Sequence, residues 1–290
     1  MAEIQELVDA YRKGDLSRRH FVRQVIMVAG GLTAALPHLR PLGFTDAEAA
    51  QVDPNDPTLE SKTVQFSGKA GTVWAYQSRP KAAGSYPAII CIHDNRGMSA
   101  HIEDVVRRFA REGYVALAVD YLSRLGGTAK VPNASTGIRN FSALAPNQVF
   151  KEETESAVEY FKSLQEVRAD RLGIMGFCMG GSLAFYLSTQ LRGFKAINIF
   201  YGSTPQPLDL LRAIEAPVLA HYGGEDPRVT GRVPETEEAM KRFGKPYTYQ
   251  IYPGAKHAFF SDDRPDSYHP RAAREAWERT IAFFSQHLKG

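Results

Sequence analysis

The segment Gly173–Gly181, with the sequence GIMGFCMGG, restricts the possible folds of this chain more than any other. A buried strand is expected to end at Met175, and a helix opens just after Cys178. Glycines two positions before and after the cysteine allow a tight turn with backbone angles that other residues avoid. A strand that turns this sharply into a helix presents the Cys178 side chain above a sheet.

Cys178 is the candidate nucleophile of a Gly-x-nucleophile-x-Gly elbow, in a place where Ser is more common. At a helix N-terminus the backbone N–H groups and the helix dipole favour a thiolate, which predicts a pKa below ~8.5. The alternative is that Cys178 is a small buried residue that merely connects strand and helix. The other cysteine, Cys91, lies in an apolar run and is expected in the core. Two cysteines exclude a disulfide framework.

Residues after 60 alternate between patterns typical of strands and of helices. Strands are predicted at 62–67, 72–78, 88–92, 114–119, 171–175, 196–201, 217–222 and 247–252. Helices are predicted at 102–111, 154–164, 182–191, 234–243 and 271–288. This alternation indicates an α/β class chain whose mainly parallel sheet carries helices on both faces, in one domain over residues 51–290. The irregular stretch 123–150 is expected to be a functional loop or lid.

A nucleophile of this type needs a base, and the base needs an orienting acid. In this architecture the chain order is nucleophile, acid, base. Asp226 follows the strand 217–222 and is the predicted acid, with the adjacent Glu225 as its rival. His257 lies in a loop led by a glycine after the strand 247–252, which makes it the predicted base.

The segment Ile92–Gly97 follows the first buried strand and is the third element of the predicted site. Such a loop donates one backbone N–H to an oxyanion, and the residue after the nucleophile donates another. The predicted donors are therefore the main chains of Asn95 and Met179. His93, Asp94 and Arg96 are polar residues at the carboxyl end of a strand, where α/β proteins bind ligands. The alternative is a solvated turn.

Residues 1–50 differ in character from the rest of the chain. Residues 1–16 have the apolar spacing of an amphipathic helix, and Ser17–Arg23 (SRRHFVR) precedes the moderately apolar Val25–Leu36. That apolar run is shorter than the roughly 20 residues of a membrane span, so no stable membrane anchor is expected. The heptapeptide resembles the twin-arginine signal of proteins exported already folded, which implies the export machinery as a partner and a periplasmic or secreted location. The alternative is an N-terminal helix that packs on the domain or on a partner of a cytoplasmic protein.

Composition excludes two further classes. The chain is 43% hydrophobic and 23% charged, which excludes a disordered protein. Its net charge of +3 comes without a pronounced block of like charges, so no nucleic-acid partner is expected.

Residues 60–290 resemble the dienelactone hydrolase family of α/β-hydrolases. The resemblance is carried by Ile92–Gly97, Gly113–Asp120, Gly176–Gly181 and Gly254–Phe259. It implies a small-molecule ester or lactone as substrate and a catalytic triad of Cys178, His257 and Asp226. It also implies catalysis without a metal or another cofactor.

Two positions depart from that family's pattern. The family's carboxylate after the first core strand, usually Glu, pairs with the resting thiol, and Asp94 is one methylene shorter, which leaves that pairing open. The prototype holds a substrate carboxylate with an Arg four residues after the catalytic His, where this chain has Ser261 in a neighbourhood made apolar by Phe259 and Phe260. Asp94 and Phe259 are predicted to bind the substrate. Three arginines remain open for that role: Arg264, Arg124 and Arg139.

The leading hypothesis is a cofactor-independent hydrolase of carboxylic esters or lactones that acts through an acyl-enzyme on Cys178. The rival is a non-hydrolytic periplasmic thiol protein, a redox or binding module on the same fold. A third reading is a hydrolase fold that has lost its activity.

Overall fold

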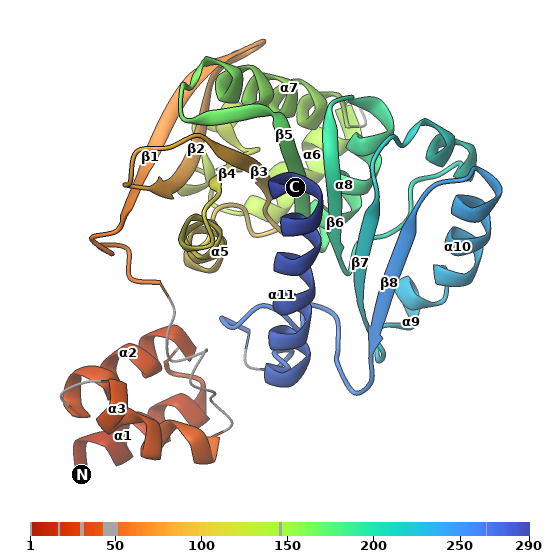
Figure 1. Ribbon diagram of the computed structural model, residues 1–290. Coiled ribbons are helices and arrows are strands. Elements are labelled where there is room, and N and C mark those ends of the chain that lie inside the picture. Colours follow the sequence, from red (N-terminus) through yellow and green to blue (C-terminus); the bar gives the residue numbers. More distant parts are fainter. Residues whose placement is uncertain (1, 17, 30–31, 43–51, 145–146, 265) are drawn as a thin grey trace.

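An eight-stranded sheet forms the centre of the molecule (Figure 1). The computed structural model describes residues 2–16, 18–29, 32–42, 52–144, 147–264 and 266–290. The strand order is β1-β2-β4-β3-β5-β6-β7-β8, in which β1, β2 and β4 pair antiparallel and all pairs from β4 to β8 are parallel. The strands are β1 Leu59–Gly68, β2 Gly71–Pro80, β3 Tyr86–Ile92, β4 Val115–Val119, β5 Val167–Phe177, β6 Phe194–Phe200, β7 Val218–Gly223 and β8 Tyr247–Tyr252. The predicted α/β class and mainly parallel sheet are confirmed.

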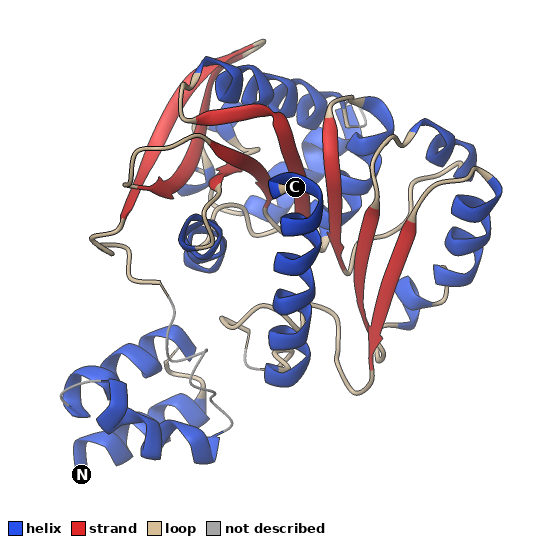
Figure 2. Cartoon of the chain, in the orientation of Figure 1, coloured by secondary structure: helices blue, strands red, loops and turns tan. Residues whose placement is uncertain are grey.

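Helices cover both faces of the sheet (Figure 2), as predicted. On one face lie α5 (Ala100–Arg111) and α11 (Pro270–Phe284), which continues as a π-helical turn, Ser285–Lys289. The other face carries α7 (Gln148–Ser163), α8 (Met179–Gln190) and α10 (Val233–Arg242). Short helical turns lie at Leu208–Ala213 and, as α9, at Pro227–Thr230.

Two apolar cores, one on each face, follow from the period-two alternation of the strands. In β3, Ile90 and Ile92 belong to the core beneath α7 and α8, while Ile89 and Cys91 belong to the core beneath α5 and α11. Cys91 is fully buried, as predicted, and burial raises the pKa of its thiol. Because the central strands are buried on both faces, their sequences are continuously apolar.

The stretch 123–150 is more regular than predicted. It contains the helix α6 (Ala134–Leu144) and two short 3-10 turns, Ser123–Leu125 and Thr128–Lys130. The prediction of an irregular loop is therefore wrong over α6. The α6 sequence is rich in Ser, Gly and Asn, which are weak helix formers. Tertiary burial outweighs that weak propensity, because Ile138 is buried in the sheet core and Phe141 packs against it.

The N-terminal region forms a separate small cluster of helices. These are α1 (Ala2–Lys13), α2 (Arg18–Ala29) and α3 (Leu32–Leu39), followed by a 3-10 turn at Arg40–Leu42. Phe21 and Val25 are fully buried in this cluster, and the Phe21 ring stacks on Tyr11. No described helix has the length and apolar character needed to cross a membrane. The predicted domain boundary at residue 50 lies outside the described residues.

Candidate active site

Cys178 lies in the connection between β5 and α8, where the sequence predicts the elbow. Its backbone has φ 56° and ψ −115°, a conformation that costs a non-glycine residue about 1–3 kcal/mol. Two backbone hydrogen bonds stabilise this strained conformation. The Cys178 N–H donates to the Phe200 carbonyl at 3.0 Å, and the Cys178 carbonyl accepts from the Ser182 N–H at 3.0 Å. These bonds hold the thiol at the start of α8 and at the carboxyl edge of the sheet.

The glycines of the elbow are required by close backbone contacts. A Cβ atom on Gly176 would lie 2.1 Å from the Gly180 carbonyl oxygen. One on Gly180 would lie 2.4 Å from the carbonyl oxygens of both Ile92 and His93. The elbow therefore packs directly against the loop that follows β3, which brings Cys178 and Asn95 into one neighbourhood.

The structure connects Cys178, His257 and Asp226 by hydrogen bonds. The Asp226 carboxylate accepts a hydrogen bond from His257 Nδ1, and His257 Nε2 lies 3.0 Å from the Cys178 sulfur. Because a carboxylate can only accept, Nδ1 carries the proton and Nε2 is left as the acceptor of the thiol proton. Asp226 is buried, whereas its rival Glu225 is exposed. This arrangement can deprotonate the thiol and hold the imidazolium that results.

The pKa of the Cys178 thiol is raised rather than lowered, which corrects the prediction from its position at a helix N-terminus. Burial of the thiol is the largest effect and disfavours the thiolate. The Met179 N–H, which hydrogen-bonds the sulfur, lowers the pKa but does not compensate. The nearby Asp94 carboxylate raises the pKa of Cys178 further, while the Arg264 and Arg228 guanidiniums lower it. Burial therefore favours the protonated thiol, and His257 Nε2, 3.0 Å from the sulfur, is placed to accept its proton.

The two predicted oxyanion donors belong to the elbow and to the loop that packs against it. The Met179 N–H points at the Cys178 sulfur, at the start of α8. The Asn95 main-chain N–H has no acceptor among the residues that the structure describes, so it is free to bind an incoming oxygen. His93 fixes the start of this loop, because its Nδ1–H donates to the Asp94 carbonyl at 2.7 Å and its Nε2 accepts from the Tyr121 N–H at 3.2 Å.

Asp94 is buried at the site, and two arginines bind its carboxylate. The Arg96 side chain approaches it to 3.0 Å and Arg264 Nη2 donates to it at 3.0 Å. Burial opposes ionisation of Asp94, but the charge of Arg96 and its hydrogen bonds outweigh burial and lower the pKa. Asp94 is thus engaged with guanidiniums, and the thiol hydrogen-bonds His257. Of the three arginines left open by the sequence, Arg264 is the one that the structure brings to the site.

Phe259, Arg124 and Arg139 are the other residues predicted to bind substrate. Phe259 is fully buried among Tyr201, Tyr252 and Phe200, so it offers no surface to a substrate. Arg124 pairs with Glu152 at 2.6 Å and Glu153 at 3.2 Å on α7. Arg139 lies exposed on α6. Both arginines lie in helical turns, because the stretch that the sequence predicts as irregular folds into them, and their role in substrate binding stays a prediction.

Two residues at the site were missed from the sequence. Tyr201 follows β6 and is buried with its ring edge-on to His257 at 5.0 Å between ring centroids. Arg228 follows Asp226 and lies 3.5 Å from its carboxylate, with its side chain 77% exposed. Each comes directly after the carboxyl end of a parallel strand or its turn, which is the signal that could have identified it.

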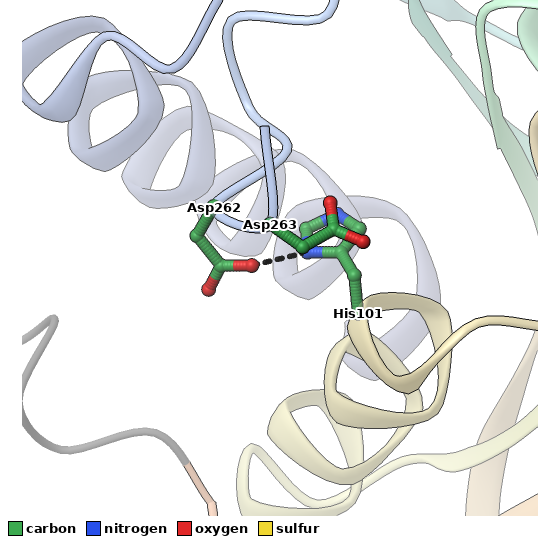
Figure 3. Close-up of side chains that lie close together, drawn as sticks. All are labelled: His101, Asp262 and Asp263. Carbon is green, nitrogen blue, oxygen red and sulfur yellow. Dashed lines mark hydrogen bonds and ion pairs between the residues drawn. The ribbon is translucent and has the colours of Figure 1, made fainter. Parts of the chain in front are cut away.

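One group of potential metal ligands occurs among the described residues. His101, Asp262 and Asp263 place ligand atoms within 4.8 Å of one another (Figure 3). Both carboxylates are already paired with guanidiniums: Asp262 with Arg108 at 3.1 Å, and Asp263 with Arg96 at 2.9 Å. A divalent cation would have to compete with two positive charges, so this donor set does not favour a metal.

Comparison with known proteins identifies relatives of the chain. The family model described as the dienelactone hydrolase family matches residues 73–288. A Bradyrhizobium protein named "Probable 2-oxo-3-(5-oxofuran-2-ylidene)propanoate lactonase" is 34% identical over 74% of this chain and 90% of its own length. A Saccharolobus solfataricus protein named "Putative carboxymethylenebutenolidase" is 32% identical over 68% of this chain and 88% of its own length.

A solved structure agrees with the sequence relatives. The crystal structure described as "Putative Dienelactone Hydrolase" from Klebsiella pneumoniae aligns with a TM-score of 0.72 at 28% identity. The alignment covers 79% of this chain and 99% of that one. From its sequence, its sheet topology and these relatives, the chain belongs to the dienelactone hydrolase family.

Proposed function

We propose that this protein hydrolyses a carboxylic ester or lactone through an acyl-enzyme on Cys178, without a metal or another cofactor. The observation that carries the proposal is the hydrogen-bonded sequence Cys178, His257, Asp226 at the elbow. The names of the relatives, a carboxymethylenebutenolidase and a lactonase, favour a lactone as the substrate.

The first half of the reaction forms a thioester. His257 Nε2 takes the thiol proton, and the Cys178 sulfur attacks the carbonyl carbon of the substrate. The carbonyl oxygen becomes an oxyanion bound by the N–H groups of Asn95 and Met179. Collapse of this intermediate breaks the bond to the alcohol oxygen, which takes the proton from His257. In a lactone that alcohol remains attached to the acyl group.

The second half regenerates the thiol. His257 removes a proton from water, the resulting hydroxide attacks the thioester carbonyl, and the same two N–H groups bind the oxyanion. The Cys178 sulfur then leaves as a thiolate and is reprotonated by His257. Asp226 remains ionised throughout and stabilises each imidazolium.

We further propose that the substrate carries a negative charge. The guanidiniums of Arg264 and Arg228 both act electrostatically on Cys178, and the Arg264 side chain is partly exposed beside Asp94. A carboxylate near the reacting carbonyl would find a charge-assisted hydrogen bond at Arg264.

Replacement of the nucleophile tests the mechanism. Cys178→Ala is expected to abolish turnover of an activated aryl ester while its circular dichroism and melting temperature stay close to wild type. With a slowly hydrolysed lactone, the wild-type enzyme is expected to gain the mass of one acyl group on Cys178. Undiminished turnover by the variant would refute the role of the thiol.

The same mass measurement distinguishes the hydrolase from the rival, a non-hydrolytic thiol protein. An oxidised or mixed-disulfide Cys178, without an acyl adduct, would favour a redox module. A redox cycle of this kind uses a second thiol to resolve the oxidised one. The buried position of Cys91 in β3 keeps it from that role.

A further inference from the structure

Four charged side chains join the loop of the oxyanion donor to the loop of the catalytic base. Arg96 Nη1 and Nη2 donate to both oxygens of Asp263, at 2.9 and 3.1 Å. In the reverse direction, Arg264 Nη2 donates to Asp94 at 3.0 Å. Each loop thus supplies one carboxylate and one guanidinium. We name these residues, Asp94, Arg96, Asp263 and Arg264, the loop clamp.

Arg96 contacts both carboxylates of the loop clamp. Besides its two bonds to Asp263, its Nε donates to Asp94 at 3.1 Å, and its main-chain N–H donates to the same carboxylate at 2.8 Å. These contacts bracket Asn95, the residue whose N–H is free for an oxyanion. A planar guanidinium can satisfy two carboxylates in fixed directions, which an ammonium cannot do.

The loop that carries Asp263 and Arg264 of the loop clamp also carries His257. His257 and Asp263 are separated by a buried apolar segment, Ala258–Phe260, and by a turn in which the Ser261 N–H donates to the Ala258 carbonyl at 3.0 Å. Because this segment is short and buried, a shift of Asp263 would also shift His257.

Helix α5 anchors the same loop from behind (Figure 3). His101 Nδ1 lies 2.7 Å from Asp262, and Arg108 bonds to both Asp262 and Asp104. His101 and Asp262 are nearly fully buried, so these groups hold the loop rather than meet solvent. With Asp262 fixed on α5, the neighbouring Asp263 is a rigid partner for Arg96.

We propose that Arg96 is a positioning residue that holds the Asn95 oxyanion donor in register with the His257 base. The proposal rests on the hydrolytic function proposed above. Two bonds to Asp263 fix the distance between the loops, and the contact with Asp94 fixes the backbone around Asn95. A small misplacement of a donor relative to the base lowers the rate of the chemical step and leaves ground-state binding largely intact.

The charge of Arg96 has a second consequence for the thiol. Asp94 acts on Cys178 as a nearby negative charge, and Arg96 compensates part of it. The other groups that face the thiol are His257, Tyr201, Arg264 and Arg228. Removal of Arg96 leaves Asp94 less compensated, so the thiolate becomes harder to form.

The test compares Arg96→Gln, Arg96→Lys and Asp263→Asn with the wild-type chain. We expect Arg96→Gln to lower kcat by roughly 10- to 100-fold, less than outright loss of an oxyanion donor, with KM changed by less than about 3-fold. Arg96→Lys keeps the charge but not the planar fork and should recover only part of kcat. In the double variant Arg96→Gln/Asp263→Asn, the losses should be much smaller than the product of the single effects.

Alkylation of Cys178 by iodoacetamide gives a readout independent of turnover. The rate is measured against pH, and the buried Cys91 contributes little signal. Arg96→Gln should move the midpoint to higher pH, while Arg96→Lys should restore it. Arg192→Gln, which breaks a surface pair with Glu215 at 2.9 Å, is the matched control and should change neither kcat nor the midpoint.

The results that would overturn the positioning role of Arg96 differ from those that would overturn the proposed hydrolytic function. A lower melting temperature with unchanged kcat and an unchanged alkylation midpoint would give Arg96 a structural role only and overturn the inference. A rise in KM without loss of kcat would place Arg96 in substrate binding and overturn it as well. If the wild type hydrolysed no ester or lactone, the proposed function would fail, and the alkylation midpoint would still decide whether Arg96 tunes the thiol.

Discussion

At the scale of single residues, the behaviour of Cys178 depends on a competition between position and burial. The start of α8 supplies a hydrogen bond that favours the thiolate, but the surrounding protein removes the thiol from water and raises its pKa. A thiol that stays protonated at rest resists oxidation, because the thiolate is the reactive form. His257 Nε2, 3.0 Å from the sulfur, is placed to accept that proton.

Arg264 is the residue by which the proposed preference for anionic substrates can be tested. Arg264→Gln should reduce kcat/KM for a carboxylate-bearing lactone about 10- to 100-fold more than for a neutral ester of similar size, because a hydrogen bond between charged groups is lost. The ratio of the two kcat/KM values is the measurement. Arg192→Gln, on the surface, is the matched control. An equal loss on both substrates would assign Arg264 to holding Asp94 alone.

At the scale of elements, α7 carries a titratable group that makes stability depend on pH. Burial raises the pKa of Glu153 to about 8, although Arg124 opposes the shift. Its side chain is 3% exposed, and one carboxylate oxygen lacks a hydrogen bond among the described residues. The folded protein therefore binds this proton more tightly than the unfolded chain does.

The sign of the pH dependence follows from linkage. Between the ordinary glutamate pKa and about 8, the folded state holds a proton that the unfolded chain has released, so stability falls as pH rises through this window. The slope from one such group is at most about 1.4 kcal/mol per pH unit. Glu153→Gln removes this contribution. In urea unfolding at pH 5, 6.5 and 8, the wild type should lose free energy of unfolding relative to the variant, and a constant difference would argue against a raised pKa.

At the scale of the whole molecule, the N-terminal helices and the sheet domain have separate apolar cores. We propose that residues 1–50 direct export of the folded enzyme, with a cytoplasmic enzyme as the alternative. The segment SRRHFVR supports this proposal, and its arginine pair begins α2. Burial of Phe21 and Val25 means that the apolar side of this segment must be uncovered before it can be recognised.

Replacement of Arg18 and Arg19 by Lys tests export. The wild-type chain should appear in the periplasmic fraction with a new N-terminus, and the double variant should remain in the cytoplasm with equal specific activity. Deletion of residues 1–50 is the control for folding: it retains Val52, whose carbonyl binds Arg107 of α5 at 3.1 Å, and should keep kcat unchanged. Intact chain found only in the cytoplasm of wild-type cells would contradict export.

The sequence by itself determined the α/β class, the elbow and the order along the chain of Cys178, Asp226 and His257. These depend on local rules: continuous apolar runs indicate strands buried on both faces, and the spacing of glycines indicates a turn that no other residue permits. For the same reason the positions of Cys178, Asp226 and His257 at the ends of strands could be predicted, because the carboxyl ends of parallel strands meet at one edge of the sheet.

Tertiary structure alone decided which charged side chains pair across the fold and how deeply the residues of the site are buried. Asp94 binds Arg264, 170 positions away, and Arg124 binds Glu153, 29 positions away. Local patterns do not encode contacts over such separations. Phe259 lies in the core between the sheet and helices α5 and α11 rather than at the surface. The raised pKa of Cys178 has the same origin, since the cost of ionisation depends on how completely the fold excludes water.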